Sequence, residues 1–224
     1  MRRTRIKICG ICRPQDARLA ADAGADAIGL VFCPASPRNL SVEQAREILA
    51  RVPPFVTPVG LFVDAPLEQI LATAQTLGLR CIQLHGHESP ALIAALKPLA
   101  VLKALRVERA TFPAVLNAWK QSIAAEHLDN LKGLLLESAS PKPGGSGIAN
   151  DWQTIEAAHS AGVFHDLPPI IAAGGLTPAT VANIVRKLRP WAVDVSSGVE
   201  EVVRQKSPEK IAGFVAAVRE ADGE

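Results

Sequence analysis

The sequence is poor in aromatic residues and nearly balanced in charge. It contains no tyrosine, aromatic residues make up 4% of the chain, and the formal net charge is +2 at pH 7. Proteins that bind single-stranded nucleic acids combine basic grooves with aromatic side chains on which the bases stack. No run of lysine and arginine here is interleaved with aromatic residues, so a nucleic-acid partner is not expected.

Long hydrophobic runs are also absent. The first ten residues, MRRTRIKICG, are basic, but no apolar segment of signal-peptide length follows them, and no run approaches the ~20 residues of a membrane span. We therefore expect a cytoplasmic protein without a membrane partner. The chain has four cysteines, which without a secretory signal indicate free thiols and not a disulfide framework.

Short apolar runs alternate with alanine-rich segments of helical periodicity, a pattern typical of βα units around a parallel sheet. Eight such runs begin at Arg5, Ala27, Pro58, Cys81, Val101, Gly133, Pro169 and Ala192. No linker rich in proline, glycine or serine divides them. We predict the α/β class and a single TIM-barrel domain, (β/α)₈, over residues 1–224. A doubly wound open sheet is the alternative, less favoured because eight repeats show so little edge protection.

Helix start signals support several of these units. Ser41 with Gln44 forms a capping box, and Thr177 and Ser207 each precede a proline, which suits the first turn of a helix. The fifth βα unit is predicted to be irregular, because the helical segment NAWKQSIAAEHLDN has no clear cap in front of it.

In such a barrel the active site lies at the carboxyl ends of the strands. The run GLLLES places Glu137 at one of these ends, where a charge is costly unless it is paired or used. Cys9 ends the first run, and strand alternation places Lys7 on the same face. A neighbouring cation would lower the thiol pKa, which suits a general base. The alternative is a cysteine that only packs.

The eighth run contains Asp194. Because the first and eighth strands are neighbours in a closed barrel, Lys7 and Asp194 are expected to pair inside it. A structural ion pair with no effect on the thiol is the other interpretation. Cys9 and Cys12 in CGIC have the spacing of a zinc or redox pair, but a zinc site needs two further ligands, so no metal is expected.

Two turns rich in glycine or serine, AAGGLTP and DVSSGVE, follow the last two strands. Backbone N–H groups in such turns bind phosphate, so phosphate binding is favoured over a role as mere tight turns. The candidate residues are Gly174, Gly175, Ser196, Ser197 and Gly198.

Two further polar residues are candidates for substrate binding. Arg38, in CPASPRNLS, is placed to clamp a substrate carboxylate in bidentate fashion, unless it is simply solvated. His85 faces the barrel mouth if Gln83 does, and its role is left open because a single histidine is often only a hydrogen-bonding residue.

The motifs KICGI, SPR, GLFVD, QLHG, GGSG, AAGGL and VDVSSGVE occur in the order, and near the spacing, found in phosphoribosylanthranilate isomerases of tryptophan biosynthesis. The chain resembles that family over about residues 5–200. The resemblance implies a (β/α)₈ barrel that needs no cofactor. It also implies the Amadori rearrangement of N-(5-phosphoribosyl)anthranilate to 1-(2-carboxyphenylamino)-1-deoxyribulose 5-phosphate.

By the same resemblance, Cys9 is the general base at C2 of the ribose and Glu137 the general acid at the ring oxygen. Arg38 holds the anthranilate carboxylate, and the two turns hold the phosphate. Lys7, His85 and Asp194 are further candidates for substrate binding, and Gly145 of GGSG is a further candidate for phosphate binding.

Two positions depart from the family pattern. Glu137 stands where aspartate is usual, and Ile148 where lysine is usual. The extra methylene moves the carboxyl group by about one bond length, and a misplacement of ~1 Å can cost ~10²-fold in rate. The alternatives are therefore a barrel acting on a related phosphoribosyl substrate, and a lapsed enzyme that only binds. A monomer is expected, with a dimer as the alternative, because no exposed apolar stripe stands out.

Overall fold

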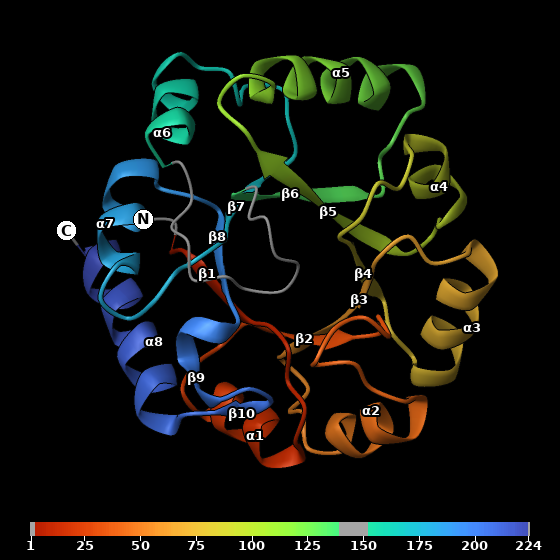
Figure 1. Cartoon of the computed structure of the whole chain (residues 1–224), viewed down its shortest axis with the longest axis vertical. Helices are drawn as coiled ribbons and strands as arrows, with labels where there is room; N and C mark the ends of the chain where they lie inside the picture. Colours follow the sequence, from red (N-terminus) through yellow and green to blue (C-terminus); the bar gives the residue numbers. More distant parts are fainter. Residues whose placement is uncertain (1–2, 139–151, 224) are drawn as a thin grey trace.

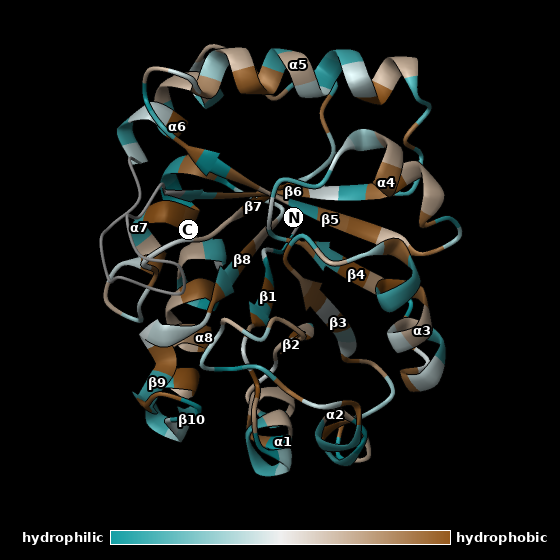
Figure 2. Cartoon of the chain, turned by 45° about the vertical axis from the view of Figure 1, so that its right-hand side comes forward, coloured by the Kyte–Doolittle hydropathy of each residue, from teal (hydrophilic) through white to brown (hydrophobic). Residues whose placement is uncertain are grey.

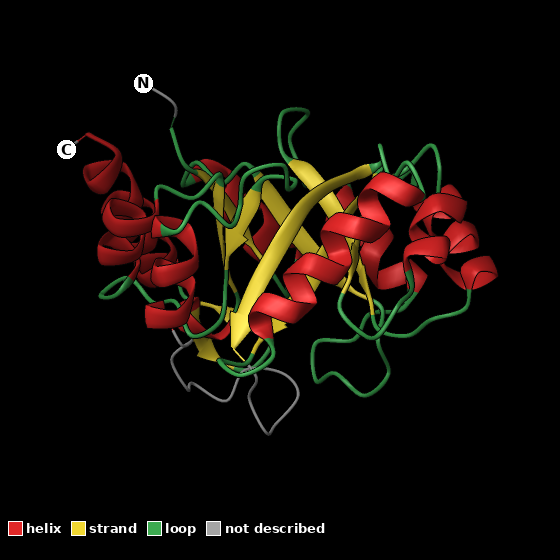
Figure 3. Cartoon of the chain, turned by 90° about the horizontal axis from the view of Figure 1, so that it is seen from above, coloured by secondary structure: helices red, strands yellow, loops and turns green. Residues whose placement is uncertain are grey.

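The computed structural model describes residues 3–138 and 152–223, so Gly145 and Ile148 lie outside the described residues. Eight parallel strands form a closed barrel in which β1 pairs with β2 and with β8 (Figures 1 and 3). The strands are β1 Arg5–Ile8, β2 Ala27–Val31, β3 Thr57–Phe62, β4 Cys81–Leu84, β5 Ala100–Val107, β6 Leu131–Ser138, β7 Ile170–Ala172 and β8 Ala192–Val195. The predicted (β/α)₈ barrel is confirmed, and the open sheet is wrong.

A helix follows each strand, and the helices form a ring around the barrel (Figure 1). They are α1 Pro14–Asp22, α2 Val42–Leu49, α3 Leu67–Leu77, α4 Pro90–Ala95, α5 Phe112–Ala125, α6 Trp152–Ser160, α7 Val181–Leu188 and α8 Pro208–Gly223. The strands are coloured mostly as hydrophobic in Figure 2, whereas each helix mixes hydrophobic and hydrophilic residues. This is expected when strands are covered on both faces and helices on one.

The buried apolar side chains form two layers separated by the sheet. The outer layer lies between strands and helices and includes Ile6 and Ile8. The inner layer fills the barrel, with Val59, Leu102 and Leu135 among its members. As predicted from strand alternation, Ile6 and Ile8 face the helices while Lys7 faces inwards. Filling by side chains makes the barrel a packed core and not a pore.

Two of the three predicted helix starts are confirmed. The Ser41 hydroxyl accepts a hydrogen bond from the Gln44 N–H, and the Gln44 side chain completes the capping box. The Ser207 hydroxyl accepts a hydrogen bond from the Lys210 N–H at the start of α8. Thr177 is wrong as a cap, because it begins a hydrogen-bonded turn with Thr180 and α7 starts only afterwards.

The fifth unit lacks a cap, as predicted: Thr111 precedes α5 without a side-chain capping hydrogen bond. The helix begins at Phe112, five residues before the segment recognised in the sequence.

An element that the sequence did not predict follows β8. A short 3₁₀ turn, η1 Ser197–Val199, leads into an antiparallel hairpin of β9 Glu200–Val202 and β10 Gln205–Lys206. Figure 1 shows this hairpin beside α1 and α8. The Lys206 N–H donates to Asp16 Oδ2, 3.2 Å away, which ties the hairpin to α1.

Candidate active site

A buried ion pair lies inside the barrel beside Cys9. The register of β1 against β8 places Lys7 opposite Asp194, and the Lys7 Nζ donates to Asp194 Oδ1 over 2.8 Å. Both side chains are buried. The predicted pair is therefore present, and it places an ammonium group next to the thiol that ends the first strand.

The environment of Cys9 corrects one expectation. Burial raises the pKa of the Cys9 thiol, and the nearby Lys7 ammonium opposes that rise without cancelling it. The expected lowering is wrong because the thiolate loses its hydration in the barrel interior, and this cost exceeds the stabilisation that the ammonium provides. Burial disfavours the ammonium of Lys7 as well, yet Asp194 and Cys9 together raise its pKa, so Lys7 is charged.

Gly29 in β2 makes room for this group. A Cβ atom added at Gly29 would lie 2.6 Å from the Cys9 Sγ and 3.2 Å from the Lys7 Nζ. Any side chain here would collide with the two atoms. The sequence held the signal, a glycine inside an apolar strand, which often marks a close approach.

At another strand end, Glu137 is paired with a histidine. The Nε2 atom of His85 lies 2.6 Å from the Glu137 Oε2, and the Gln83 Nε2 lies 3.0 Å from the His85 Nδ1. If the Gln83 amide nitrogen donates to Nδ1, a neutral imidazole carries its proton on Nε2 and directs it at Glu137. The structure thus brings Gln83, His85 and Glu137 together, and it explains the charge after three leucines as a paired one.

Opposing effects act on the Glu137 carboxyl. Burial raises its pKa, but the hydrogen bond to His85 and the positive charges around it outweigh burial, so the pKa is lowered overall. An acid group usually benefits from a raised pKa. Glu137 therefore acts as an acid together with the hydrogen-bonded His85, and not through its own carboxyl group alone.

Arg38 is buried, so its interpretation as a solvated loop residue is wrong: it is 6% exposed. Its Nε and Nη2 atoms donate to the two carboxylate oxygens of Glu200 over 2.8 and 2.6 Å. A bidentate clamp on a substrate through that edge is excluded, because Glu200 occupies it. Glu200 was missed in the sequence although it stands in the VDVSSGVE motif, since nothing in the motif names its partner.

The two phosphate-turn candidates meet in space. Gly174 and Gly175 have φ values of 88° and 67°, which favour glycine. Gly198 packs directly against the backbone carbonyl of Leu176, so the turns after β7 and β8 are in contact. Within the described residues, the backbone N–H groups of Gly174, Gly175, Ser197 and Gly198 have no hydrogen-bond partner. Such open donors suit an anion.

A buried lysine supports the loops beside His85. Lys103 is paired with Glu88 over 2.9 Å and also donates to the carbonyl of Gly86. Glu88 in turn accepts hydrogen bonds from the backbone N–H groups of Asp64 and Gly86. The loops after β3 and β4 are thereby joined through one carboxylate next to His85.

Among the residues that the structure describes, no group of three or more histidine, cysteine, aspartate or glutamate side chains is placed to hold a metal ion. In the same residues, no helix has the length and apolar character needed to cross a bilayer.

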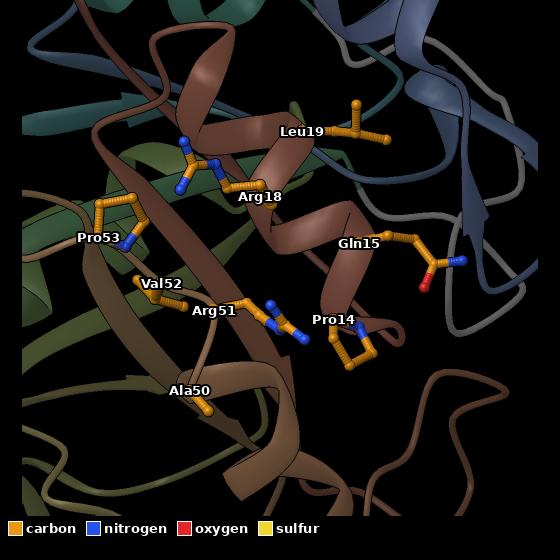
Figure 4. A pocket seen from close by; sticks show the side chains of 8 residues that line it. All are labelled: Pro14, Gln15, Arg18, Leu19, Ala50, Arg51, Val52 and Pro53. Carbon is orange, nitrogen blue, oxygen red and sulfur yellow. The ribbon is translucent and has the colours of Figure 1, made fainter.

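A surface groove between α1 and the segment after α2 contains none of the candidate site residues. Figure 4 shows α1 side chains on one side of it and that segment on the other. It is lined by Pro14, Gln15, Arg18, Leu19, Ala50, Arg51, Val52 and Pro53. The Arg18 side chain there is engaged with Asp22 on the same helix, over 2.8 Å. We therefore place the site at the strand ends and not in this groove.

The closed barrel and the polar groups at its carboxyl end define a (β/α)₈-barrel enzyme. Residues 6–217 match the family model described as N-(5'phosphoribosyl)anthranilate (PRA) isomerase. The chain belongs to the N-(5'-phosphoribosyl)anthranilate isomerase family.

Relatives of that family align along nearly the whole chain. The N-(5'-phosphoribosyl)anthranilate isomerase of Geotalea daltonii is 44% identical, over 98% of this chain and 99% of the relative. That of Acidithiobacillus ferrooxidans is 46% identical, over 96% and 97%. The solved isomerase of Thermotoga maritima has a TM-score of 0.84 at 35% identity, with 97% and 99% covered.

A further solved isomerase is in complex with reduced 1-(o-carboxyphenylamino)-1-deoxyribulose 5-phosphate. It has a TM-score of 0.80 at 33% identity, with 97% of this chain and 99% of that chain covered.

Replacing Gly29 by alanine should impair the site more than the fold. The added methyl group would meet the Cys9 Sγ at 2.6 Å, so the thiol has to move. We expect a fall in kcat/KM of ~10²-fold, as for other displacements of about 1 Å. Gly60→Ala is the matched control, because its methyl group would meet Leu79 at 2.8 Å on the helix-facing side of β3.

Steady-state kinetics and thermal unfolding should be measured on both variants. The control should lose stability but keep its kinetic constants. Equal kinetic losses in the two variants would show that Gly29 matters only for packing.

Proposed function

We propose that Cys9 and Glu137 catalyse the Amadori rearrangement of N-(5'-phosphoribosyl)anthranilate to 1-(2-carboxyphenylamino)-1-deoxyribulose 5-phosphate in tryptophan biosynthesis, without a cofactor. The family match over residues 6–217 supports the reaction. The observation that carries the assignment of roles is the pairing at two strand ends: Cys9 lies beside an ammonium group and Glu137 beside a histidine.

The first step opens the furanose ring. The His85–Glu137 pair, carrying one proton more than its resting form, delivers that proton through Glu137 to the ring oxygen. The C1–O4' bond breaks as the nitrogen lone pair forms a C1=N double bond, which leaves a protonated imine. The hydrogen bond between Glu137 and His85 keeps the carboxyl group in place for this transfer.

The second step removes the proton from C2. The Cys9 thiolate accepts it, the electron pair forms the C1=C2 bond, and the positive charge on nitrogen is neutralised. The resulting enol then gives the ketone as solvent supplies a proton at C1 and accepts the proton of the C2 hydroxyl. Cys9 returns its proton to solvent and the His85–Glu137 pair takes one up, which restores the enzyme. A protonated imine beside the thiol favours the thiolate, which offsets the effect of burial on Cys9.

The remaining candidates hold the substrate. Arg38 takes the anthranilate carboxylate with the edge of its guanidinium group that Glu200 leaves unused. The open N–H groups of the two turns take the phosphate. Gly145 of the GGSG loop, which lies outside the described residues, is a further candidate for phosphate binding. Lys7, Asp194 and His85 line the sugar.

Glutamate in place of the usual aspartate is compatible with this role. Glu137 lies opposite Arg106 in the strand register, and its carboxylate is within hydrogen-bond distance of the His85 imidazole. No finding favours a related phosphoribosyl substrate or a lapsed binding protein.

Substitution of the two catalytic groups tests the assignment. Cys9→Ser and Glu137→Gln should each lower kcat by ~10²–10⁴-fold, the usual contribution of a general base or acid. Glu137→Asp should keep most activity. Cys81→Ser is the control, because Cys81 begins β4 and lies at the other end of the barrel.

Turnover of phosphoribosylanthranilate and complementation of a tryptophan auxotroph that lacks the isomerase are the two measurements. A Glu137→Gln enzyme as fast as the parent would refute the acid, and binding of substrate without turnover by the parent would identify a lapsed enzyme.

The pH dependence should reflect the buried thiol. Cys9 is active as thiolate, and its pKa is raised above the ordinary 9.0, so the part of the kcat/KM profile that reflects the thiol should lie at higher pH than for an ordinary cysteine. Lys7→Met should move the thiol limb to higher pH, because the ammonium lowers the thiol pKa. A thiol pKa higher by about one leaves roughly tenfold less thiolate at neutral pH.

The matched control is Lys187→Met, at a partly exposed surface ion pair with Glu156. Its pH profile should equal that of the parent. An unchanged profile in Lys7→Met would mean that the ion pair has no effect on the thiol.

A cytoplasmic monomer is the accompanying proposal. A further solved structure of an isomerase from Thermotoga maritima is described as that of monomers generated from a dimeric enzyme. Here Phe55, in the segment after α2, is 98% exposed and is the feature that favours a dimer. The other exposed large apolar residues lie on different elements, and one phenylalanine covers far less than the ~800 Å² per partner of a stable interface.

Light scattering coupled to gel filtration decides between the two states. A mass near 23.7 kDa agrees with the monomer. A mass of twice that value, unchanged on dilution, would contradict it.

A further inference from the structure

We propose that Glu200 and Arg204 are positioning residues, which make the β9–β10 hairpin hold Arg38 in the orientation that binds the substrate carboxylate. This inference rests on the proposed function, and it concerns residues whose side chains need not touch the substrate. Two sets of hydrogen bonds between the hairpin and the loop after β2 support it. In one set the loop supplies the donor, and in the other the hairpin does.

The first set runs from the loop to the hairpin. The Arg38 Nε and Nη2 atoms donate hydrogen bonds to the two carboxylate oxygens of Glu200, and both side chains are buried. This fork–fork geometry fixes the plane of the guanidinium group. The Arg38 Nη1 atom has no hydrogen-bond partner among the described residues. Unlike the unpaired atoms that are fully buried, it is still accessible to a ligand. One edge of the guanidinium group is therefore held and the other is open.

The second set runs from the hairpin to the loop. The Arg204 Nη1 donates to the carbonyl oxygens of Pro37 and Asn39, over 2.7 and 3.1 Å. These residues lie on either side of Arg38 in the chain, so Arg204 grips the backbone from which the Arg38 side chain projects. Arg204 itself has a φ of 74°, a conformation that glycine adopts without strain and arginine does not. The contacts of its side chain offset that local cost.

The held arginine lies between the two parts of the site. A Cβ atom at Gly10, the residue after Cys9, would lie 2.5 Å from the Arg38 Cδ and 2.9 Å from the Ser196 Oγ. The stem of Arg38 thus passes over the loop that begins at Cys9 and beside the turn proposed for the phosphate. A small rotation of Arg38 would move the carboxylate-binding edge relative to both groups.

The charges of the cluster also favour an incoming anion. Lys206 is 1% exposed and donates to the Glu200 Oε1 and to the carbonyl of Ser196, over 3.1 and 3.0 Å. Glu200 therefore faces two cations, Arg38 and Lys206, and the trio carries one positive charge in excess. A carboxylate on the open edge of Arg38 balances that charge.

Binding measurements separate a positioning role from a merely structural one. The probes are reduced 1-(o-carboxyphenylamino)-1-deoxyribulose 5-phosphate and the same compound without its carboxylate. Glu200→Gln removes the charge that holds Arg38 and keeps the size of the side chain. We expect its Kd for the first probe to rise about tenfold and its Kd for the second to remain that of the parent. Glu201→Gln, at the exposed neighbouring position, is the control and should change neither.

Arg204→Gly provides an independent second variant. Glycine adopts the positive φ without strain, so the unfolding temperature should not fall. The hydrogen bonds to Pro37 and Asn39 are lost, so the Kd for the carboxylate probe should rise several-fold. Arg189→Gly is the matched control: Arg189 is an exposed arginine with a φ of 42° at the end of α7. Its unfolding temperature should likewise not fall, and its Kd for the carboxylate probe should equal that of the parent.

The outcomes are distinct. Equal weakening of both probes in Glu200→Gln, or no weakening of the carboxylate probe in either variant, would overturn the positioning role. Failure of the parent protein to bind the carboxylate probe, or to turn over phosphoribosylanthranilate, would instead refute the proposed function.

Discussion

The ion pair between Lys7 and Asp194 is the interaction on which the rest of the site depends. Removing either charge alone from water into the barrel interior would cost several kcal/mol, so each residue requires the other. The pair spans the seam between the first and last strands, where the chain closes on itself. A slip of one residue in either strand would turn one of the charges towards the apolar helix layer. The pair therefore specifies the register of closure and at the same time sets a fixed cation beside Cys9.

The barrel could be predicted from the sequence because its signal is repeated and local. Each apolar run is buried on both faces, and each following segment has the period of a helix, so eight weak signals support one another. The β9–β10 hairpin has no such support. Its strands are three and two residues long. Hydrogen bonds between charged side chains and groups distant in sequence hold it in place, such as that of Arg204 to the Pro37 carbonyl. Thr177 failed as a cap for a different, local reason, since its hydroxyl lies in a turn with Thr180.

The candidate site divides in the same way. The rule that polar residues at strand ends meet at one face was sufficient to select Cys9, His85 and Glu137, and alternation was sufficient to select Lys7 with Asp194. What the rule cannot supply is the partner of a side chain or the dielectric around it. Glu200 was therefore missed as the partner of Arg38. The predicted direction of the change in the Cys9 pKa was wrong because a sequence shows which cation is near but not how completely the thiol is buried.

Glu137 shows how these limits combine. Its position explains why a carboxylate ends the sixth strand, and its contact with His85 shows how a half-buried charge is tolerated there. The same contact lowers its pKa, which taken alone would make it a poor acid. The His85 imidazole lies 2.6 Å from this carboxylate, however, close enough for a proton to pass between them, so the proposed acid is the hydrogen-bonded pair. Aspartate and glutamate have nearly equal acidity, so either carboxylate can act with His85 at this strand end if it lies within hydrogen-bond distance of the imidazole.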